Sequence, residues 1–268
     1  LDVLSKRPDG YHDLKMIMQT IYLSDTVTLQ VIDKGIEVYC SNPNIPVGEG
    51  NIAYKAAEIM IQKYNINRGI RIDIDKQIPV AAGLAGGSSN AAAVIKGINE
   101  LFSLGLSDSE LLALGKQIGA DVPYCIKGGT MLAEGIGEVL TELDMLQGIN
   151  ILLVKPKIDI STAWVYKNLD LEKKAERPNT DFLIDCIKER RIDKLAANMK
   201  NVLETVSIKE YRIIEYIKNR MIEFGAQGSM MSGSGPSVFG IFKDRQSVEN
   251  AYNKMKDERW DSFITFTC

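Results

Sequence analysis

Alternation of apolar and polar residues predicts strands along the first third of the chain. Apolar and polar residues alternate over residues 26–32, and they alternate strictly over residues 70–75, as expected of strands that bury one face. Shorter apolar segments at residues 1–4 and 36–40 predict two further strands, and a turn-rich sequence at residues 6–13 follows the first of them. This part of the chain is therefore expected to be mainly β-structure.

Two segments combine helical spacing of apolar residues with capping signals. Asn51 precedes a predicted helix that extends to about residue 64. Ser107 and Glu110 form an S-x-x-E capping box before a second helix, and Gly119 stands where that helix is expected to end in a left-handed residue. Local sequence thus marks both helices.

The second half of the chain passes from strands to helices and back. Strand patterns occur in GTMLAEG, VLTEL and INILLVKP, and later in VFGIF and SFITF. Helical patterns dominate residues 161–224. We interpret the helices of residues 181–224 as packing elements whose charged faces need no ligand. A change in character at residues 155–157 predicts two lobes, residues 1–155 and 156–268. The predicted class is α+β, with mixed sheets and interleaved helices rather than the regular alternation of a doubly wound fold.

Composition and charge are those of an ordinary soluble protein. The 268 residues, 45% hydrophobic and 25% charged, can bury a substantial core. The net charge of -3 produces no positive electrostatic field that would attract a polyanion, so neither nucleic acid nor a membrane surface is an expected partner. The cysteines form no C-x-x-C pair, which favours a reducing cytoplasm over a zinc site. No apolar run of about 18 residues and no signal-peptide pattern occurs, so neither a membrane span nor secretion is predicted.

The glycine-rich sequence PVAAGLAGGSSN, residues 79–90, is the main chemical signal. It joins a predicted strand to a helix of small residues whose first turn is expected at residues 90–93. Glycine permits positive φ and close approach to backbone amides, and a helix N-terminus offers unpaired N–H groups. The loop is therefore predicted to hold a phosphate through main-chain groups. Ser88 and Ser89 add hydroxyl donors, or a ligand for a phosphate-bound magnesium ion.

The loop is richer in glycine and serine than a purely structural turn requires. A tight connection with a serine cap is the simplest interpretation, but the glycines and two serines exceed what a cap needs. The P-loop pattern G-x-x-x-x-G-K-[ST] is absent, and so is G-x-G-x-x-G with a following acidic residue. Phosphate binding of another type is the interpretation that these residues favour.

The sequence P-x-x-A-G-L-A-G-G-S-S-N-A-A resembles the second motif of the GHMP kinases, named for galactose, homoserine, mevalonate and phosphomevalonate substrates. KRPDGYHDL and GADVPYCIKGGTMLAEGIGE resemble one branch, which phosphorylates a cytidine diphosphate sugar-alcohol for isoprenoid precursor synthesis by the non-mevalonate route. SMMSGSGPSVFGIF resembles the third motif. The resemblance covers nearly the whole chain. It implies a two-lobed GHMP kinase fold, ATP and Mg²⁺ as cofactors, and a small-molecule substrate.

The resemblance also implies roles for particular residues. In the G-A-D-V-P sequence, Asp121 is expected to be catalytic, by removing the proton of the acceptor hydroxyl or by orienting it. The first lobe, 1–155, is expected to bind ATP, and the second, 156–268, to close over the substrate. The expected ATP-binding residues are Pro79, Val80, Ala81, Ala82, Gly83, Leu84, Ala85, Gly86, Gly87, Ser88 and Ser89.

The cytosine of the substrate is expected to meet aromatic side chains. In the branch resembled, the Y-H pair, here Tyr11 and His12, contacts the base by stacking and hydrogen bonding. Tyr166 would supply the aromatic on the other side, with Trp164 as the alternative register. Flat faces and donor–acceptor pairing are what cytosine requires.

Several alternatives stay open at this point. The family pairs its aspartate with a lysine in P-A-K-x-N-L, which precedes the segment that begins here. Because residues 1–4 read as the end of a strand, we expect upstream residues to be missing; Lys6 lies beyond the motif and is a poor substitute. Another GHMP kinase, of homoserine or mevalonate type, or a nucleotide-binding regulator without turnover, are the alternative functions. Residues 225–235 are expected to close over substrate or phosphates, and the magnesium ligands and oligomeric state are unassigned.

Overall fold

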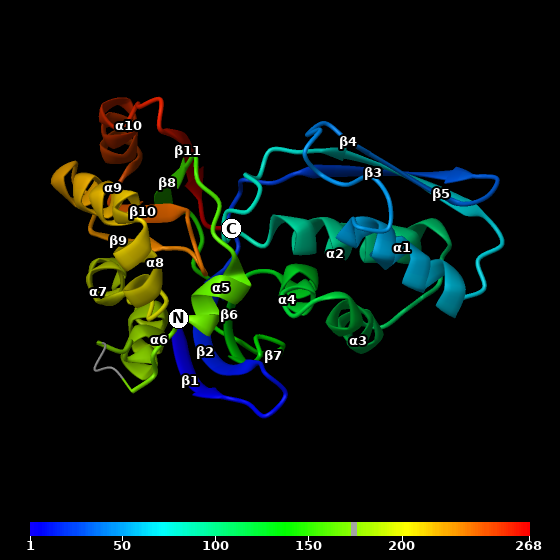
Figure 1. Cartoon of the computed structure of the whole chain (residues 1–268), viewed down its shortest axis with the longest axis horizontal. Coiled ribbons are helices and arrows are strands. Elements are labelled where there is room, and N and C mark those ends of the chain that lie inside the picture. Colours follow the sequence, from blue (N-terminus) through cyan, green and yellow to red (C-terminus); the bar gives the residue numbers. More distant parts are fainter. Residues whose placement is uncertain (173–175) are drawn as a thin grey trace. The chain divides into compact units, whose positions relative to one another are not determined.

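The computed structural model describes residues 1–172 and 176–268 (Figure 1). The strands are β1 (Asp2–Lys6), β2 (His12–Gln19), β3 (Thr26–Ile32), β4 (Ile36–Cys40), β5 (Gly69–Asp75), β6 (Thr130–Gly135), β7 (Val139–Glu142), β8 (Asn150–Pro156), β9 (Gly228–Met231), β10 (Val238–Phe242) and β11 (Trp260–Phe266). The helices are α1 (Ile52–Lys63), α2 (Gly86–Leu101), α3 (Asp108–Ile118), α4 (Val122–Lys127), α5 (Thr162–Lys167), α6 (Thr180–Lys188), α7 (Ile192–Asn198), α8 (Glu204–Glu210), α9 (Arg212–Glu223) and α10 (Arg245–Lys254). The part of the predicted helical stretch at residues 173–175 lies outside the described residues.

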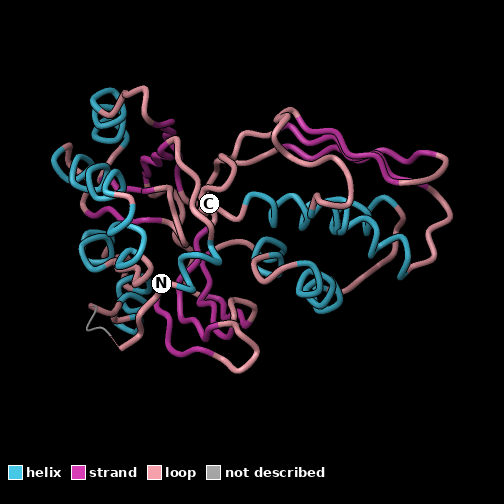
Figure 2. The backbone as a smooth tube through the Cα atoms, in the orientation of Figure 1, coloured by secondary structure: helices cyan, strands magenta, loops and turns pink. Residues whose placement is uncertain are grey.

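Helices and strands alternate irregularly along the chain, and the strands form several sheets (Figure 2). The strand orders are β1-β2-β6-β7, β11-β8-β10-β9 and β3-β5-β4. Nearly all neighbouring strands are antiparallel, whereas β4 and β5 are parallel. This mixture confirms the predicted α+β class.

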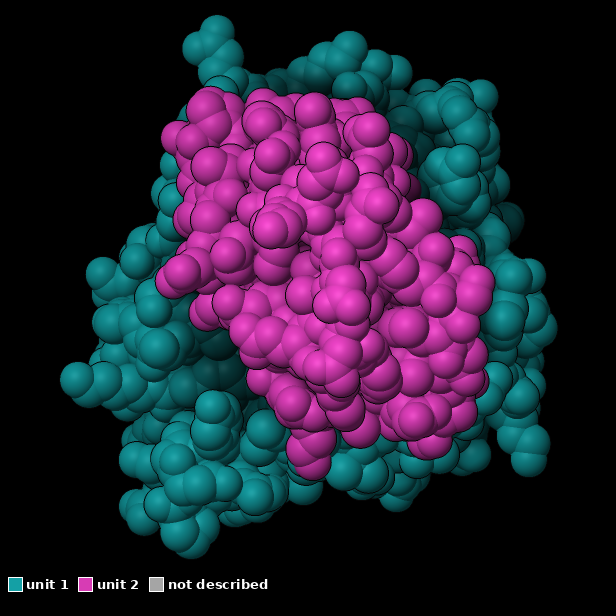
Figure 3. Space-filling view, turned by 90° about the vertical axis from the view of Figure 1, so that its right-hand side faces the viewer, with its two compact units in different colours: residues 1–22, 80–84, 129–268 teal, residues 23–79, 85–128 magenta. Residues whose placement is uncertain are grey.

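The chain divides into two compact units, coloured separately in Figure 3. Unit 1 comprises Leu1–Tyr22, Val80–Leu84 and Gly129–Cys268, and unit 2 comprises Leu23–Pro79 and Ala85–Gly128. The predicted lobe boundary between residues 155 and 156 falls within unit 1, inside β8. As a division of function, that boundary stays a prediction.

Unit 2 is a three-stranded sheet with helices packed on one face (Figure 1). Every second residue of β5 is buried, as the alternating pattern predicted. Ile70, Ile72 and Ile74 are at most 3% exposed and pack with alanines and aliphatic residues of α1 and α2. The small residues that opened the α2 pattern therefore allow close helix-to-sheet packing.

The predicted helix caps of unit 2 are confirmed at their N-termini. The Asn51 side chain accepts a hydrogen bond from the Ala53 amide at 2.8 Å, and Ser107 with Glu110 forms a complete capping box. The prediction of a left-handed residue at Gly119 is wrong, because its φ of -179° and ψ of 154° are extended. The chain continues almost directly into α4 at that point, and an extended residue followed by a turn makes the connection.

Unit 1 contains the two four-stranded sheets and the C-terminal helices. β8 lies inside its sheet, between β11 and β10, and six of its seven residues are buried. Leu152 and Val154 belong to a core that includes Ile214, Ile217 and Met221 from α9. In the parts of the chain that are described, no helix has the length and apolar character needed to cross a membrane.

Candidate active site

The glycine-rich segment leads into α2 earlier than expected. The first turn of the helix was predicted at residues 90–93, but α2 begins at Gly86, so this prediction is wrong. The amide of Ser89 donates to the carbonyl of Ala85 at 2.8 Å. The amides of residues 86–88 precede that bond and have no acceptor within the helix, so they are the groups suited to an anion.

Tertiary contacts explain why two glycines can start this helix. A Cβ on Gly86 would lie 3.0 Å from Ile78 Cγ2, and one on Gly87 would lie 3.3 Å from Ile52 Cγ2. Both distances are short, so the backbone of the first turn packs where a side chain would be crowded. Low intrinsic helix propensity is thereby overridden by packing.

The loop before α2 contains three residues with positive φ. Gly83 has φ 69°, but Ala81 and Ala85 also adopt the left-handed region, with φ 50° and 51°. The left-handed conformation costs an L-residue with a Cβ roughly 1–2 kcal/mol. The expectation that glycine would supply positive φ thus holds at Gly83, while the alanines carry a local strain that the surrounding structure must hold.

Within unit 1, the loop is fixed through Gly83. Its carbonyl accepts a hydrogen bond from Ser232 Oγ at 2.8 Å, and a Cβ on Gly83 would lie only 2.3 Å from the Ser232 carbonyl oxygen. Only glycine fits this close approach at positive φ. Ser232 belongs to the third glycine-rich segment, which therefore contacts the predicted ATP loop directly.

Within unit 2, a buried ion pair fixes the approach to the loop. Lys76 Nζ lies 2.7 Å from Asp25 Oδ2 and 2.6 Å from the Ile78 carbonyl oxygen, and the two charged side chains are 4% and 1% exposed. Asp25 Oδ1 accepts the amides of Gln77 and Ile78. Local sequence patterns do not reveal this pair. A lysine between a strand and the proline of the loop is the available signal, but its partner is 51 residues away.

Asp121 occupies the N-cap position of α4. Its side chain makes no capping hydrogen bond, and no hydrogen bond from the described residues reaches its carboxylate. Gly115 allows α3 and α4 to pack closely, because a Cβ on Gly115 would lie 2.9 Å from Ile126 Cδ1 of α4. Burial raises the pKa of Asp121 above its ordinary value. A half-buried carboxylate of raised basicity is suited to proton transfer.

One turn after Asp121 lies a thiol. Burial, with a smaller contribution from the Asp121 charge, raises the pKa of Cys125 to about 12. The thiol therefore stays protonated and is not a nucleophile at neutral pH. Asp121 is the group in this turn with acid–base chemistry to offer.

In unit 1 the structure brings His12 and Tyr166 together. Their ring centroids are 5.1 Å apart with planes inclined by 33°. Burial, and next the charge of Lys6, lower the pKa of His12, so its neutral ring offers one donor and one acceptor nitrogen. Trp164, the alternative register, instead contacts the ring of Tyr211 at 6.2 Å. Tyr11 is 59% exposed.

No cluster of three or more histidine, cysteine, aspartate or glutamate residues in the described chain is arranged to hold a metal ion. Mg²⁺ commonly keeps water and phosphate oxygens and takes only one or two protein ligands. The hydroxyls of Ser88 and Ser89, in the first turn of α2, fit such a limited set.

Comparison with known proteins places these features in a family. The profile of the GHMP kinases N terminal domain matches residues 51–129, and that of the GHMP kinases C terminal region matches residues 183–261. A protein of Acetivibrio thermocellus named 4-diphosphocytidyl-2-C-methyl-D-erythritol kinase is 57% identical over 267 residues, covering 100% of this chain and 94% of that protein. The chain belongs to the GHMP kinase family.

Further relatives agree with this GHMP kinase assignment. A Clostridium botulinum protein of the same name is 50% identical and covers 100% of this chain and 95% of its own length. The crystal structure of a 4-(cytidine 5'-diphospho)-2C-methyl-D-erythritol kinase superposes with TM-score 0.84 at 26% identity, over 99% of this chain and 94% of that one. A homoserine kinase of Cytophaga hutchinsonii, at 19% identity and TM-score 0.79, covers 94% and 88% and shares the fold.

These findings confirm the family, the fold and the branch predicted from the sequence motifs. They also confirm that the chain is an ATP-dependent small-molecule kinase. The roles of individual residues stay predictions.

Proposed function

We propose that this chain transfers the γ-phosphoryl group of ATP to the 2-hydroxyl of 4-diphosphocytidyl-2-C-methyl-D-erythritol, a step of non-mevalonate isoprenoid precursor biosynthesis. The observation that carries the proposal is 57% identity over 267 residues to the Acetivibrio thermocellus kinase of that name. The products are the 2-phosphate of the substrate and ADP.

ATP binds to the glycine-rich loop and the start of α2, residues 79–89. Amides of residues 86–88 lie at a helix N-terminus, where unpaired N–H groups and the helix dipole favour phosphate oxygens. Bound Mg²⁺ would neutralise charge on the phosphate oxygens, and the hydroxyl of Ser88 or Ser89 would hold the ion. The Ser232 bond to Gly83 and the Asp25–Lys76 pair maintain the loop backbone.

Asp121 acts on the acceptor hydroxyl. As the hydroxyl oxygen forms its bond to the γ-phosphorus, the bond from that phosphorus to the bridging oxygen breaks and ADP leaves. The Asp121 carboxylate orients the hydroxyl and receives its proton. The raised pKa supports this role, because a more basic carboxylate holds the proton better.

His12 and Tyr166 bind the cytosine of the acceptor. A base cannot fit between them, because two stacking distances of about 3.5 Å exceed their 5.1 Å ring separation. The base therefore pairs its edge with the neutral His12 ring and stacks on an outer aromatic face, for which Tyr166 and the exposed Tyr11 are available.

We further propose that residues 1–155 hold ATP, that residues 156–268 close over the substrate, and that the protein works in the cytoplasm. The two family profiles match residues 51–129 and 183–261, and residue 155 lies between these two matches. The four cysteines are free, in keeping with a reducing compartment.

The test measures phosphate transfer from ATP to the cytidylated methylerythritol, to homoserine and to mevalonate, with Mg²⁺ and full-length protein. We expect phosphorylation of the first acceptor, with the product identified by ³¹P NMR. Preferred transfer to homoserine or mevalonate would overturn the substrate assignment. ATP binding without transfer to any acceptor would favour a nucleotide-binding regulator.

A further inference from the structure

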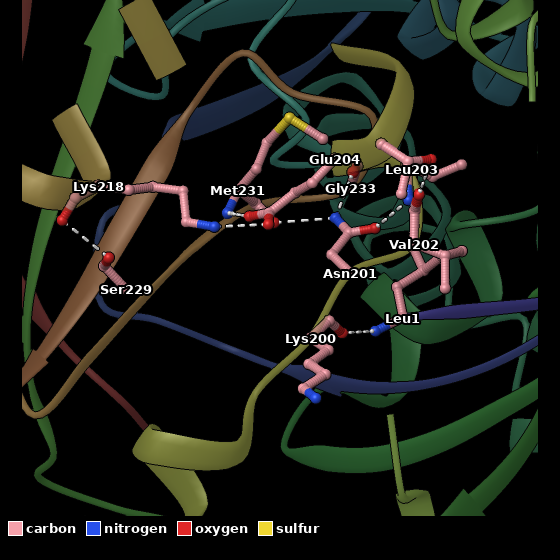
Figure 4. Close-up of polar contacts among 11 residues, drawn as sticks. Leu1, Lys200, Asn201, Val202, Leu203, Glu204, Lys218, Ser229, Met231 and Gly233 are labelled. Carbon is pink, nitrogen blue, oxygen red and sulfur yellow. Dashed lines mark hydrogen bonds and ion pairs between the residues drawn. The ribbon is translucent and has the colours of Figure 1, made fainter. Parts of the chain in front are cut away.

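The segment between α7 and α8 carries a buried asparagine that faces the third glycine-rich loop (Figure 4). Asn201 is 4% exposed, and its Nδ2 donates to the carbonyl oxygens of Met231 at 2.9 Å and Gly233 at 2.8 Å. Its Oδ1 accepts the Leu203 amide at 3.0 Å. Both amide protons are thus used to hold main-chain atoms of one loop.

Glu204, three residues later, also binds this loop, through its carboxylate. Its Oε1 accepts the Met231 amide at 2.7 Å, while Oε2 lies 2.5 Å from Lys218 Nζ (Figure 4). The two charged side chains are 15% and 22% exposed, so water does not dominate the pair. Ser207 Oγ, fully buried, adds a hydrogen bond to the Ser234 carbonyl at 3.3 Å.

Four of these hydrogen bonds are made to main-chain atoms of the loop. Main-chain atoms of Met231, Gly233 and Ser234 are each bound by a side chain from residues 201–207. Ser232, inside that stretch, donates its hydroxyl proton to the Gly83 carbonyl at 2.8 Å. A displacement of the loop backbone is therefore transmitted to Gly83.

We propose that Asn201 and Glu204 are positioning residues for nucleotide binding, acting through Met231–Gly233 and Ser232 on Gly83. They fix the third glycine-rich loop so that the Ser232 hydroxyl holds the ATP loop in its binding conformation. The proposal rests on the proposed role of the loop in ATP binding, but on no particular acceptor. Lys218 fixes the Glu204 carboxylate through its side chain, and its carbonyl oxygen accepts a hydrogen bond from Ser229 Oγ at 3.0 Å.

The test is calorimetric binding of the non-hydrolysable analogue adenylyl imidodiphosphate, with Mg²⁺ and no acceptor. We expect Asn201→Ala and Glu204→Ala each to weaken binding of the analogue roughly tenfold, because each removes hydrogen bonds that hold the loop backbone. Glu204→Gln keeps an acceptor for the Met231 amide and should bind within about twofold of wild type. Glu223→Ala, which breaks a 2.6 Å pair with Arg220 on α9, is the matched control and should bind as wild type.

Ser232→Ala keeps residues 201–207 intact and removes only the link to Gly83. It should weaken binding to the same extent, and the double variant with Glu204→Ala should be no weaker than either single variant. Exchange of the Met231 amide with D₂O should accelerate in Glu204→Ala but not in Ser232→Ala. Because Ser232→Ala leaves the buried network unchanged, it reports on the link even if Asn201→Ala does not fold.

Binding that is unchanged in folded Asn201→Ala and Glu204→Ala proteins would overturn the proposal, as would additive losses in the double variant. Wild-type protein that binds the analogue but does not phosphorylate the cytidylated acceptor would contradict the proposed function alone. Failure of the wild type to bind the analogue would contradict both.

Discussion

Lys76 and Asp25 form an ion pair of 2.7 Å in the interior of unit 2, with side chains only 4% and 1% exposed. Replacing Asp25 by Asn would leave the ammonium buried without its counter-charge. We expect a loss of about 3–5 kcal/mol in the free energy of unfolding. Urea titration followed by circular dichroism measures it. Asp33→Asn, which breaks an exposed 3.4 Å pair with Arg68, is the control and should be almost neutral. Equal effects would contradict the importance of the buried pair.

Asp121→Asn removes the proposed proton acceptor while keeping the size of the side chain. We expect kcat to fall about 10²–10⁴-fold, the usual contribution of a positioned base. Binding of ATP should be nearly unchanged, because the loop amides are untouched. Single-turnover rates with ³²P-labelled ATP separate the chemical step from product release, and a rate equal to wild type would refute the role of Asp121.

The same substitution should change stability in a pH-dependent direction. Since burial raises the folded-state pKa of Asp121, ionising it costs the folded state more than the unfolded state. That cost is absent below the unfolded pKa and reaches its full value above the raised folded pKa. Asp121→Asn should therefore be more stable than wild type at neutral pH, and this advantage should vanish below pH 3.8. Thermal unfolding of both proteins at each pH gives the comparison; an advantage independent of pH would exclude this cause.

Tyr166→Ala should raise KM for the cytidylated acceptor about tenfold, within the range for loss of base stacking, and leave KM for ATP unchanged. Tyr166→Phe keeps the ring and should retain the stacking contribution to KM for the acceptor. Tyr22→Ala removes another aromatic ring of unit 1, stacked on Phe266 and 66% exposed, and should alter neither constant. Steady-state kinetics with the concentration of each substrate varied in turn measure both KM values. A rise in KM for ATP alone would show that Tyr166 affects ATP binding and not acceptor binding.

Gly83 and Gly105 provide a matched pair of positive-φ glycines. A Cβ on Gly83, at φ 69°, would clash with the Ser232 carbonyl at 2.3 Å, whereas nothing lies within 4 Å of one on Gly105, at φ 66°. Gly105→Ala should cost roughly 1–2 kcal/mol in unfolding free energy and spare ATP binding. Gly83→Ala should cost more and should also weaken ATP binding. Similar unfolding and binding data for the two variants would mean that the close contact does not matter.

Helix starts were predictable where the information is local. The Asn51 cap binds an amide two residues on, and the Ser107 box closes over three residues. The start of α2 was not predictable in this way, because glycines at its first two positions disfavour a helix and only packing against Ile78 and Ile52 explains them.

In the candidate site, too, features encoded by short local motifs were predictable, whereas contacts between distant residues were not. The glycine-rich loop and Asp121 stand in recognisable short motifs, so their positions could be read from the sequence. Their supports join distant residues: Asn201 is 30 residues from Met231, and Glu204 lies on a helix whose charged residues resemble an ordinary solvated face. Alternation and spacing carry no information about such pairings.

The division of the chain into units has a consequence for its synthesis. All strands of unit 2 have been made once Asp75 is added, and its last helix ends at Lys127. The N-terminal β2 must wait for β6 at Thr130, and Ile21 pairs with Thr267. On the ribosome, the elements of unit 2 can therefore come together before those of unit 1, in which β2 is made well before its partner β6. Until then the edge of β2 is open to incorrect pairing, which makes this edge the place where chaperone binding to the nascent chain is expected.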